Sequence, residues 1–431
     1  MEQRGICLIN DSFPPVTDGV ANAVVNYAKI LTENGKQATV VTPAYPGADD
    51  SQFAFPIVRY PSVDLTKLVG YHAGFPFSSQ TLETLVERDF DLIHCHCPVT
   101  SAMLARALRD RIHVPLVFTY HTKFDIDIAN AIKGKLLQEE AKKVLVDNIT
   151  ACDEVWTVSH GAGENLKSLG YQGDYLVMPN GVDFPKGRVD ESLVREVTKD
   201  FDLPENVPMF LFVGRMMWYK GLKIILDALA MLKTQGRPFR MVFVGNGGDR
   251  DEVIAYSEKL GLSDCVFFTA PAYDRNVIRA WYCRADLFLF PSTFDTNGLV
   301  VREAAACGLG SVLVRGSCAA EDIRDGESGF LIEENAESMA RMLTALSRNP
   351  EAMQRVGKTA QDEIYISWKD AVTHAQARYE TVLENFKARK YPAHNRQSDE
   401  AFHAISSYLA AVGRGQEKLR LRMEELSERF L

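Results

Sequence analysis

The hydrophobic and polar positions of this chain follow two alternating patterns along most of its length. Short apolar runs rich in β-branched and aromatic residues precede longer segments in which apolar residues recur every three or four positions. The first unit comprises an expected strand at 5–10, a helix at 20–35 and a second strand at 37–42. The pattern continues with expected strands at 90–96, 115–121 and 154–159 and with helices between them. This alternation of strands and helices is typical of a parallel sheet covered by helices.

The pattern breaks once and then starts again. A polar, acidic stretch follows residue 184 and continues to about residue 206. Beyond it, expected strands lie at 209–214, 239–245, 265–268, 287–290 and 311–314. We therefore predict an α/β protein of two tandem Rossmann-like domains, whose parallel sheets face a cleft between the domains. The predicted segments are an N-terminal acceptor domain at 1–190, a C-terminal donor domain at 191–366, a helix at 367–390 that packs back toward the first domain, and a helical extension at 391–431.

Composition and charge exclude several classes of protein. The chain of 431 residues is 46% hydrophobic and 24% charged, which is typical of a globular protein. Its net charge of −9 argues against a nucleic-acid surface. No basic region precedes the first apolar strand, and no apolar run reaches the ~20 residues that span a bilayer. We expect a cytoplasmic protein whose eight cysteines are reduced.

Two segments contain residue types that bind metals. In HCHC at 94–97, the side chains of a strand alternate, so both histidines lie on one face and both cysteines on the other. Four ligands in that arrangement cannot converge on one ion. Asp125 and Asp127 form an acidic pair of the kind that holds Mn²⁺ or Mg²⁺ in sugar transferases of another fold, but no second nucleotide-binding feature lies beside it. We expect no metal site and no cofactor.

The residues whose side chains could take part in binding or catalysis lie where expected strands end. Arg215 and Lys220 flank a tight loop that opens a helix, and a helix N-terminus with two cations is suited to a phosphate. The alternative is a pair of solvated surface cations. Gly19 lies between the first strand and the first helix, where it is either a turn glycine or a close approach to a ligand. His121 follows a strand at the edge where parallel sheets bind ligands.

Segment 291–308 places two acids, Asp295 and Glu303, in a turn between a strand and an alanine-rich helix. The simplest interpretation is that Asp295 caps the helix and that Glu303 is a solvated acid on its surface. The alternative is that both carboxylates bind a ligand at the carboxyl edge of the sheet.

Five motifs in sequence order distinguish these interpretations. They are PNGVD at 179–183, GRMMWYKG at 214–221, VGNGG at 244–248, DTNGLVVREAAACG at 295–308 and DGESGFL at 325–331. The set resembles the retaining, nucleotide-sugar-dependent glycosyltransferases of family 4, also called glycosyl transferase group 1. The resemblance covers roughly residues 5–388 and implies the GT-B fold of two Rossmann-like domains.

The resemblance implies a donor site in the second domain. Glu303 would accept both hydroxyls of the nucleotide ribose, and Asp295 would hold hydroxyls of the donor sugar. The backbone amides of Asn297, Gly298 and Leu299 would complete the cradle. The family motif normally has Glu where this chain has Asp295, which shortens the reach by roughly 1.5 Å and leaves the donor sugar open.

The resemblance also implies a mechanism. Arg215 and Lys220 would stabilise the leaving phosphate without a metal, His121 would contact the donor sugar, and the anomeric configuration would be retained. His121, Asp295, Arg215 and Lys220 are therefore the expected catalytic residues, and Gly19 joins the donor-binding set. The donor is expected to be a UDP-sugar or a GDP-sugar. The open alternatives are a sugar-nucleotide binding module or an epimerase on the same fold.

The sequence says less about the identity of the acceptor than about the donor. Segments 120–125 and 295–301 look more like those of lipid-directed members, such as diacylglycerol glucosyltransferases, than like those of starch or sucrose enzymes. This suggests a lipid acceptor and peripheral contact with a membrane. Segment 128–145 combines basic and apolar residues. This combination is typical of a helix on a membrane surface, and the alternative is a core helix with a solvated basic edge. The lysines are Lys133, Lys135, Lys142 and Lys143, and the apolar residues are Ile128, Ile132, Leu136 and Leu137.

The C-terminal extension lies outside the resemblance. Apolar residues recur there at helical spacing on both sides of a Gly-Arg-Gly break at 413–415, which predicts two short amphipathic helices. Helices this short must bury their apolar face. We expect them to dock on the N-terminal domain, with a subunit interface as the alternative, so the oligomeric state stays open.

Overall fold

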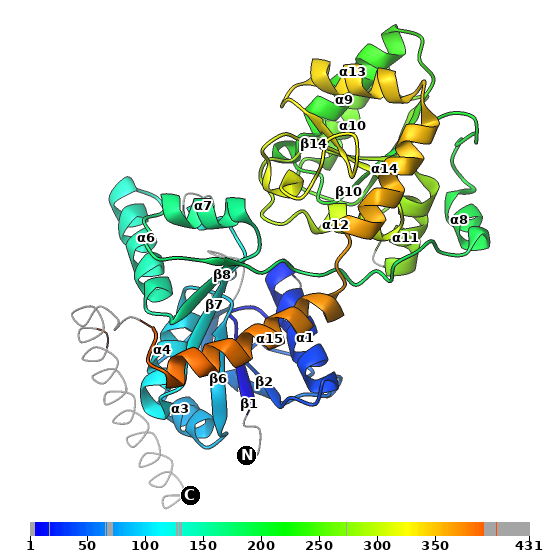
Figure 1. The fold of residues 1–431 in the computed structure, drawn as a ribbon. Coiled ribbons are helices and arrows are strands. Elements are labelled where there is room, and N and C mark those ends of the chain that lie inside the picture. Colours follow the sequence, from blue (N-terminus) through cyan, green and yellow to red (C-terminus); the bar gives the residue numbers. More distant parts are fainter. Residues whose placement is uncertain are drawn as a thin grey trace, which may run out of the picture. The chain divides into compact units, whose positions relative to one another are not determined.

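The structure of this chain is a computed structural model. It describes residues 5–391, except 17, 65, 67–71, 126, 127, 129–131 and 273, together with Phe402. The chain divides into two compact units, Met1–Pro179 with Ala371–Leu431, and Asn180–Asp370. Each unit has its own parallel sheet with helices packed against it, so the predicted α/β class with two Rossmann-like halves is confirmed (Figure 1).

The first unit contains a seven-stranded sheet in the order β3-β2-β1-β6-β7-β8-β9, in which every pairing is parallel. The strands are β1 (Gly5–Ile9), β2 (Ala38–Pro43), β3 (Ile57–Tyr60), β6 (Phe90–Cys95), β7 (Leu116–Tyr120), β8 (Glu154–Thr157) and β9 (Leu176–Val177). A separate antiparallel pair is formed by β4 (Ser62–Asp64) and β5 (His72–Gly74). The winding direction reverses between β1 and β6, and ligands of such sheets bind at this switch point.

The helices of the first unit are α1 (Gly19–Glu33), α3 (Ser79–Val86), α4 (Thr100–Ile112), α6 (Lys135–Thr150), α7 (His160–Ser168) and the long C-terminal α15 (Trp368–Lys387). Helix α1 begins where the Asp18 carboxylate accepts from the amides of Val20 and Ala21 at 2.8 and 2.7 Å. The loop before α1 is therefore fixed by a side-chain cap at its helical end.

The second unit contains a six-stranded parallel sheet in the order β12-β11-β10-β13-β14-β15. The strands are β10 (Met209–Val213), β11 (Arg240–Val244), β12 (Val266–Phe268), β13 (Leu287–Phe290), β14 (Ser311–Val314) and β15 (Phe330–Ile332). The helices are α8 (Glu191–Thr198), α9 (Leu222–Thr234), α10 (Arg250–Lys259), α11 (Arg275–Arg284), α12 (Leu299–Ala306), α13 (Ala336–Leu346) and α14 (Pro350–Glu363), with short 3₁₀ turns η1 (Trp218–Lys220) and η2 (Cys318–Ala320). Here the switch point lies between β10 and β13.

Helix α15 returns to the first unit and lies beside α1 (Figure 1). The guanidinium of Arg378 donates to both carboxylate oxygens of Glu154 at 2.8 Å. The Tyr379 ring stacks on Trp156 with centroids 5.4 Å apart. These contacts join the last described helix to the strand β8.

Most of the C-terminal extension lies outside the described residues, and so do the two amphipathic helices predicted there. Phe402 is described, and the Arg106 guanidinium lies 3.9 Å from the centroid of its ring. None of the described helices combines the length and apolar character needed to cross a bilayer. All eight cysteines are free thiols.

Candidate functional site

The loops that follow β10 and β13 lie against each other at the switch point of the second sheet. Gly221 ends the first loop at a φ of +77°, and an added Cβ there would lie 2.4 Å from the carbonyl oxygen of Pro291. Only glycine combines this backbone conformation with so close an approach. The packing of these two loops therefore depends on Gly221, and it brings the loop of Lys220 beside the loop of Asp295.

Lys220 and Asp295 form a direct ion pair at this junction. The Lys220 ammonium donates to Asp295 Oδ1 at 2.5 Å, and the Ser292 hydroxyl donates to Asp295 Oδ2 at 2.6 Å. Lys220 is 93% buried, with an exposed fraction of 7%, so it is not a solvated surface cation. Arg215 differs, because it is exposed and its guanidinium makes no hydrogen bond or ion pair within the described part of the chain.

The N-terminus of α12 has no side-chain cap among the described residues. Gly298 precedes the helix at a φ of +61°. An added Cβ on Gly298 would lie 2.8 Å from Ala319 Cβ, so this position also requires glycine. The interpretation of Asp295 as the helix cap is therefore wrong. The side chain of Asn297 accepts from Arg302 at 3.3 Å, and Leu299 is the first residue of the helix.

Glu303 lies on α12 as a buried acid with two partners. It is 8% exposed, so the interpretation of a solvated surface acid is wrong. Arg275 Nη2 donates to Oε1 at 2.7 Å, and the Tyr282 hydroxyl donates to Oε2 at 3.1 Å. Burial raises the pKa of Glu303, and the nearby Arg275 charge opposes that rise. The Arg275 guanidinium also lies 4.3 Å from the ring centroid of Phe184.

Sequence reasoning missed Arg275 and Tyr282. Both lie on α11, and Arg275 precedes Glu303 by 28 positions. Neither belongs to a recognised motif, so no spacing rule indicated them. The signal that could have been used is chemical: an acid predicted to be functional inside an apolar, alanine-rich helix requires a cationic partner.

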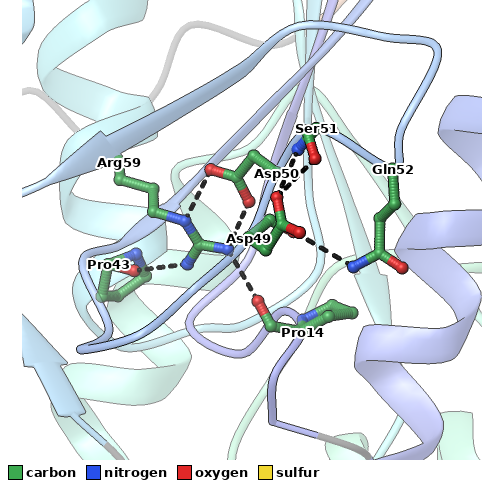
Figure 2. Close-up of polar contacts among 7 residues, drawn as sticks. All are labelled: Pro14, Pro43, Asp49, Asp50, Ser51, Gln52 and Arg59. Atoms are coloured by element: carbon green, nitrogen blue, oxygen red, sulfur yellow. Dashed lines mark hydrogen bonds and ion pairs between the residues drawn. The ribbon is translucent and has the colours of Figure 1, made fainter.

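In the first unit, the loop that leads to Gly19 is held from the neighbouring strand β3 (Figure 2). Arg59 donates to both carboxylate oxygens of Asp50 at 2.9 and 2.7 Å, and to the carbonyl oxygen of Pro14 at 2.6 Å. An added Cβ on Gly19 would meet nothing within 4 Å. Crowding by described residues therefore does not explain the glycine, and its contact with a ligand stays a prediction.

His121 lies directly after β7 within a cluster of buried histidines. His121 Nε2 is 3.0 Å from His96 Nδ1, and the rings of His96 and His94 are 4.0 Å apart between centroids. The two histidines of segment 94–97 thus share one face of β6, as the alternation of a strand predicts. Burial lowers the pKa of His121 to about 3 and holds the pKa values of His94 and His96 well below their usual range. All three imidazoles are neutral at physiological pH.

Two acids of the first unit, Asp11 and Asp125, are hydrogen-bonded to other side chains or backbone of that unit. Asp11 follows β1, and its Oδ1 accepts from the amide and hydroxyl of Ser101 at 2.8 and 2.6 Å. Asp125 accepts from Asn165 at 3.2 Å, and Asp127 lies outside the described residues. Within the described part of the chain, no three His, Cys, Asp or Glu side chains are grouped to hold a metal ion.

Two family models match this chain, one in each half. "Glycosyl transferases group 1" matches residues 194–363, and "Glycosyltransferase Family 4" matches residues 17–185. Together they cover every described strand except β1, and they include Gly19, His121, Arg215, Lys220, Asp295 and Glu303. The matches confirm the resemblance drawn from the five motifs.

Similar proteins include both enzymes and solved structures. The alpha-monoglucosyldiacylglycerol synthase of Streptococcus pneumoniae is 22% identical over 70% of this chain and 69% of its own. The D-inositol 3-phosphate glycosyltransferase of Thermomonospora curvata is 27% identical over 70% of this chain and 74% of its own. The structure of Anabaena Alr3699/HepE in complex with UDP has a TM-score of 0.69 and 20% identity, covering 88% of this chain and 99% of that one. At that identity the structural similarity indicates the fold alone.

Proposed function

The chain belongs to the family 4 glycosyltransferases of glycosyl transferase group 1, and we propose that it transfers a hexosyl group from a nucleoside diphosphate sugar to an acceptor hydroxyl with retention of configuration. We favour a UDP-sugar as the donor, with a GDP-sugar as the second choice. The observation that carries the proposal is the pair of carboxylates at one sheet edge, Asp295 on Lys220 and Glu303 on Arg275.

Glu303 is suited to bind the nucleotide ribose. Each carboxylate oxygen accepts one hydrogen bond from the protein and has remaining acceptor capacity for one ribose hydroxyl. Arg275 favours the ionised form of this buried acid, and an ionised carboxylate is the stronger acceptor. We therefore assign the ribose to Glu303 rather than to Asp295.

The diphosphate is assigned to Lys220, Arg215 and the uncapped N-terminus of α12. When the anomeric C–O bond breaks, negative charge grows on the leaving phosphate and the sugar becomes oxocarbenium-like. Preorganised cations and amides stabilise that charge without reorganisation. In this proposal the acceptor hydroxyl attacks from the face of the leaving group and gives its proton to the departing phosphate, which requires no metal.

Asp295 and His121 are assigned to the donor sugar. The Asp295 side chain is shorter than the Glu of the family motif, and its Oδ1 is bonded directly to Lys220. The ammonium of Lys220 would thus both orient the sugar-binding carboxylate of Asp295 and neutralise charge on the phosphate. Neutral His121 can hydrogen-bond a sugar hydroxyl without adding a charge near the developing oxocarbenium ion.

A membrane glycerolipid is our proposed acceptor, and α6 is the proposed site of peripheral membrane contact. Leu136 and Leu137 are 76% and 61% exposed, and Val144 lies on the same helical face. The interpretation of segment 128–145 as a core helix is therefore wrong for its apolar residues at 136 and 137. Exposed leucines beside Lys143 are a combination that binds lipid surfaces.

The test follows nucleotide release from UDP-glucose and from a GDP-hexose, with and without vesicles that contain diacylglycerol. We expect UDP release that depends on the acceptor, with a glycolipid product of the donor's anomeric configuration. Tight nucleotide binding without any release would instead indicate a binding module. A change of sugar isomer without UDP release would indicate an epimerase.

A further inference from the structure

The contact between His96 and His121 joins two buried, neutral rings. His96 is 1% exposed and His121 is 7% exposed. Their facing atoms, His96 Nδ1 and His121 Nε2, lie 3.0 Å apart, which is hydrogen-bond distance. A neutral imidazole has one protonated and one bare nitrogen, so one of these two atoms must donate and the other must accept.

The far nitrogen of His96 decides the direction of this bond. His96 Nε2 is buried and has no hydrogen-bond partner among the described residues. If His96 carried its proton on Nε2, a buried N–H group would lack an acceptor, and orphaned N–H groups are the rarer of the two kinds of unsatisfied group. The proton of His96 therefore belongs on Nδ1, where it is donated to His121. His121 then accepts at Nε2 and carries its own proton on Nδ1.

The surrounding side chains hold the His96 ring in this plane. The His94 ring lies 4.0 Å away between centroids, and the Tyr27 ring packs edge-on at 5.4 Å. His94 is itself fixed from both sides, because Nδ1 is 2.6 Å from the Tyr379 hydroxyl and Nε2 is 2.7 Å from the Thr119 hydroxyl. The C-terminal helix α15, which contributes Tyr379, thus supports a group of packed rings that includes His121.

We propose that His96 is a positioning residue, which sets the tautomer and the ring plane of His121 for the transfer reaction. The inference rests on the proposed function, in which His121 contacts the donor sugar. If both tautomers of His121 were present, the nitrogen that serves the sugar would be a hydrogen-bond donor in only some of the molecules. In the proposed reaction this nitrogen must donate. The effect of losing His96 therefore falls on turnover more than on nucleotide binding, which belongs to the second unit.

The test combines three variants of the full-length protein. His96→Leu removes the donor, and His96→Asn keeps a side-chain N–H near the position of Nδ1. Tyr379→Phe is the matched control, because it disturbs the same stack through His94 and leaves the contact between His96 and His121 in place. Circular dichroism and thermal unfolding establish that each variant is folded.

Nitrogen NMR of protein labelled with ¹⁵N-histidine reads the tautomer directly, with the His121 signals assigned by their loss in His121→Asn. We expect a protonated Nδ1 and a bare Nε2 at His121 in the wild type and in Tyr379→Phe. We expect a mixture of tautomers in His96→Leu. A wild-type His121 that is protonated at Nε2 would overturn the proposal, whether or not the protein transfers a sugar.

Steady-state kinetics measure how the loss of His96 affects turnover. We expect kcat to fall by at least about tenfold in His96→Leu, which is the size of effect known for partners that orient metal-binding histidines. We expect recovery in His96→Asn and little change in UDP affinity. A wild-type kcat in a folded His96→Leu protein would overturn the proposal. If His96→Leu does not fold, the tautomer of wild-type His121 and the kcat of His96→Asn test the proposal in its place. A wild-type protein without transferase activity would refute the proposed function instead, and the NMR measurement would still decide the tautomer.

Discussion

Replacing Arg275 by methionine tests the proposal that this guanidinium prepares the buried Glu303 carboxylate to bind a nucleotide. Methionine keeps apolar contact with the ring of Phe184 but removes the donor that lies 2.7 Å from Glu303 Oε1. A hydrogen bond to a charged group contributes about 1.5 to 3 kcal/mol. The Arg275 side chain is 44% exposed, so solvent screening places the loss near the lower bound. We therefore expect UDP to bind roughly tenfold more weakly at pH 7.

The pH dependence distinguishes an effect through Glu303 from a direct contact. Burial already raises the pKa of Glu303, and loss of the Arg275 charge raises that pKa further. The ribose needs the ionised acid, so the affinity deficit of Arg275→Met should grow as the pH falls from 8 to 6 and shrink as it rises. Isothermal titration calorimetry with UDP at several pH values measures this trend.

Arg279→Met provides the matched control on the same helix. Arg279 also lies over Phe184, at 5.8 Å, but its guanidinium donates to the carbonyl oxygen of Gly187 and not to Glu303. We expect near wild-type UDP affinity in this control. Wild-type affinity of Arg275→Met across the whole pH range would refute the reasoning. A deficit that is equal at every pH would mean that Arg275 contacts the nucleotide itself.

Four further outcomes are expected. Lys220→Met should lower kcat by about a hundredfold and UDP affinity by much less, because charge on the leaving phosphate grows in the transition state; an unchanged kcat would contradict the phosphate assignment. Activity should persist in EDTA, and loss of activity that Mn²⁺ restores would contradict the metal-free mechanism. Replacing Leu136 and Leu137 by aspartate should reduce sedimentation with anionic vesicles and leave UDP binding unchanged. The three buried histidines keep their folded pKa values below the unfolded value of ~6.5, so stability should fall as the pH drops below 6.5, by up to about 1.4 kcal/mol per histidine and pH unit; urea unfolding at pH 7.5 and 5.5 measures this loss.

Much of the fold can be predicted from local patterns in the sequence. Apolar runs of four or five residues, such as those of β10 and β13, are buried on both faces, and the helices between them repeat with helical periodicity. The strands that the pattern did not predict are β3, β4, β5, β9 and β15. Each is short, and β3 and β9 lie at sheet edges where burial is incomplete. Periodicity is a weak signal in such strands because neither face is fully apolar.

The candidate site was predicted as positions rather than as contacts. Parallel strands end at the same sheet edge, so loops that follow neighbouring strands must lie close together, and the motifs around Lys220, Asp295 and Glu303 could be placed there from sequence alone. The sequence also determined that the two histidines of segment 94–97 share a face, because side chains of a strand alternate.

Only the tertiary structure decided which side chain holds which. Lys220 and Asp295 are 75 positions apart, and His94 and Tyr379 are 285 positions apart. No period along the chain encodes such pairs, since they depend on strand order, on loop packing at Gly221 and on the return of α15 to the first unit. The partner of Glu303 could not be predicted for the same reason. The burial of this acid is a property of its folded surroundings, and so is the approach of the Arg275 guanidinium, whose charge favours the ionised carboxylate.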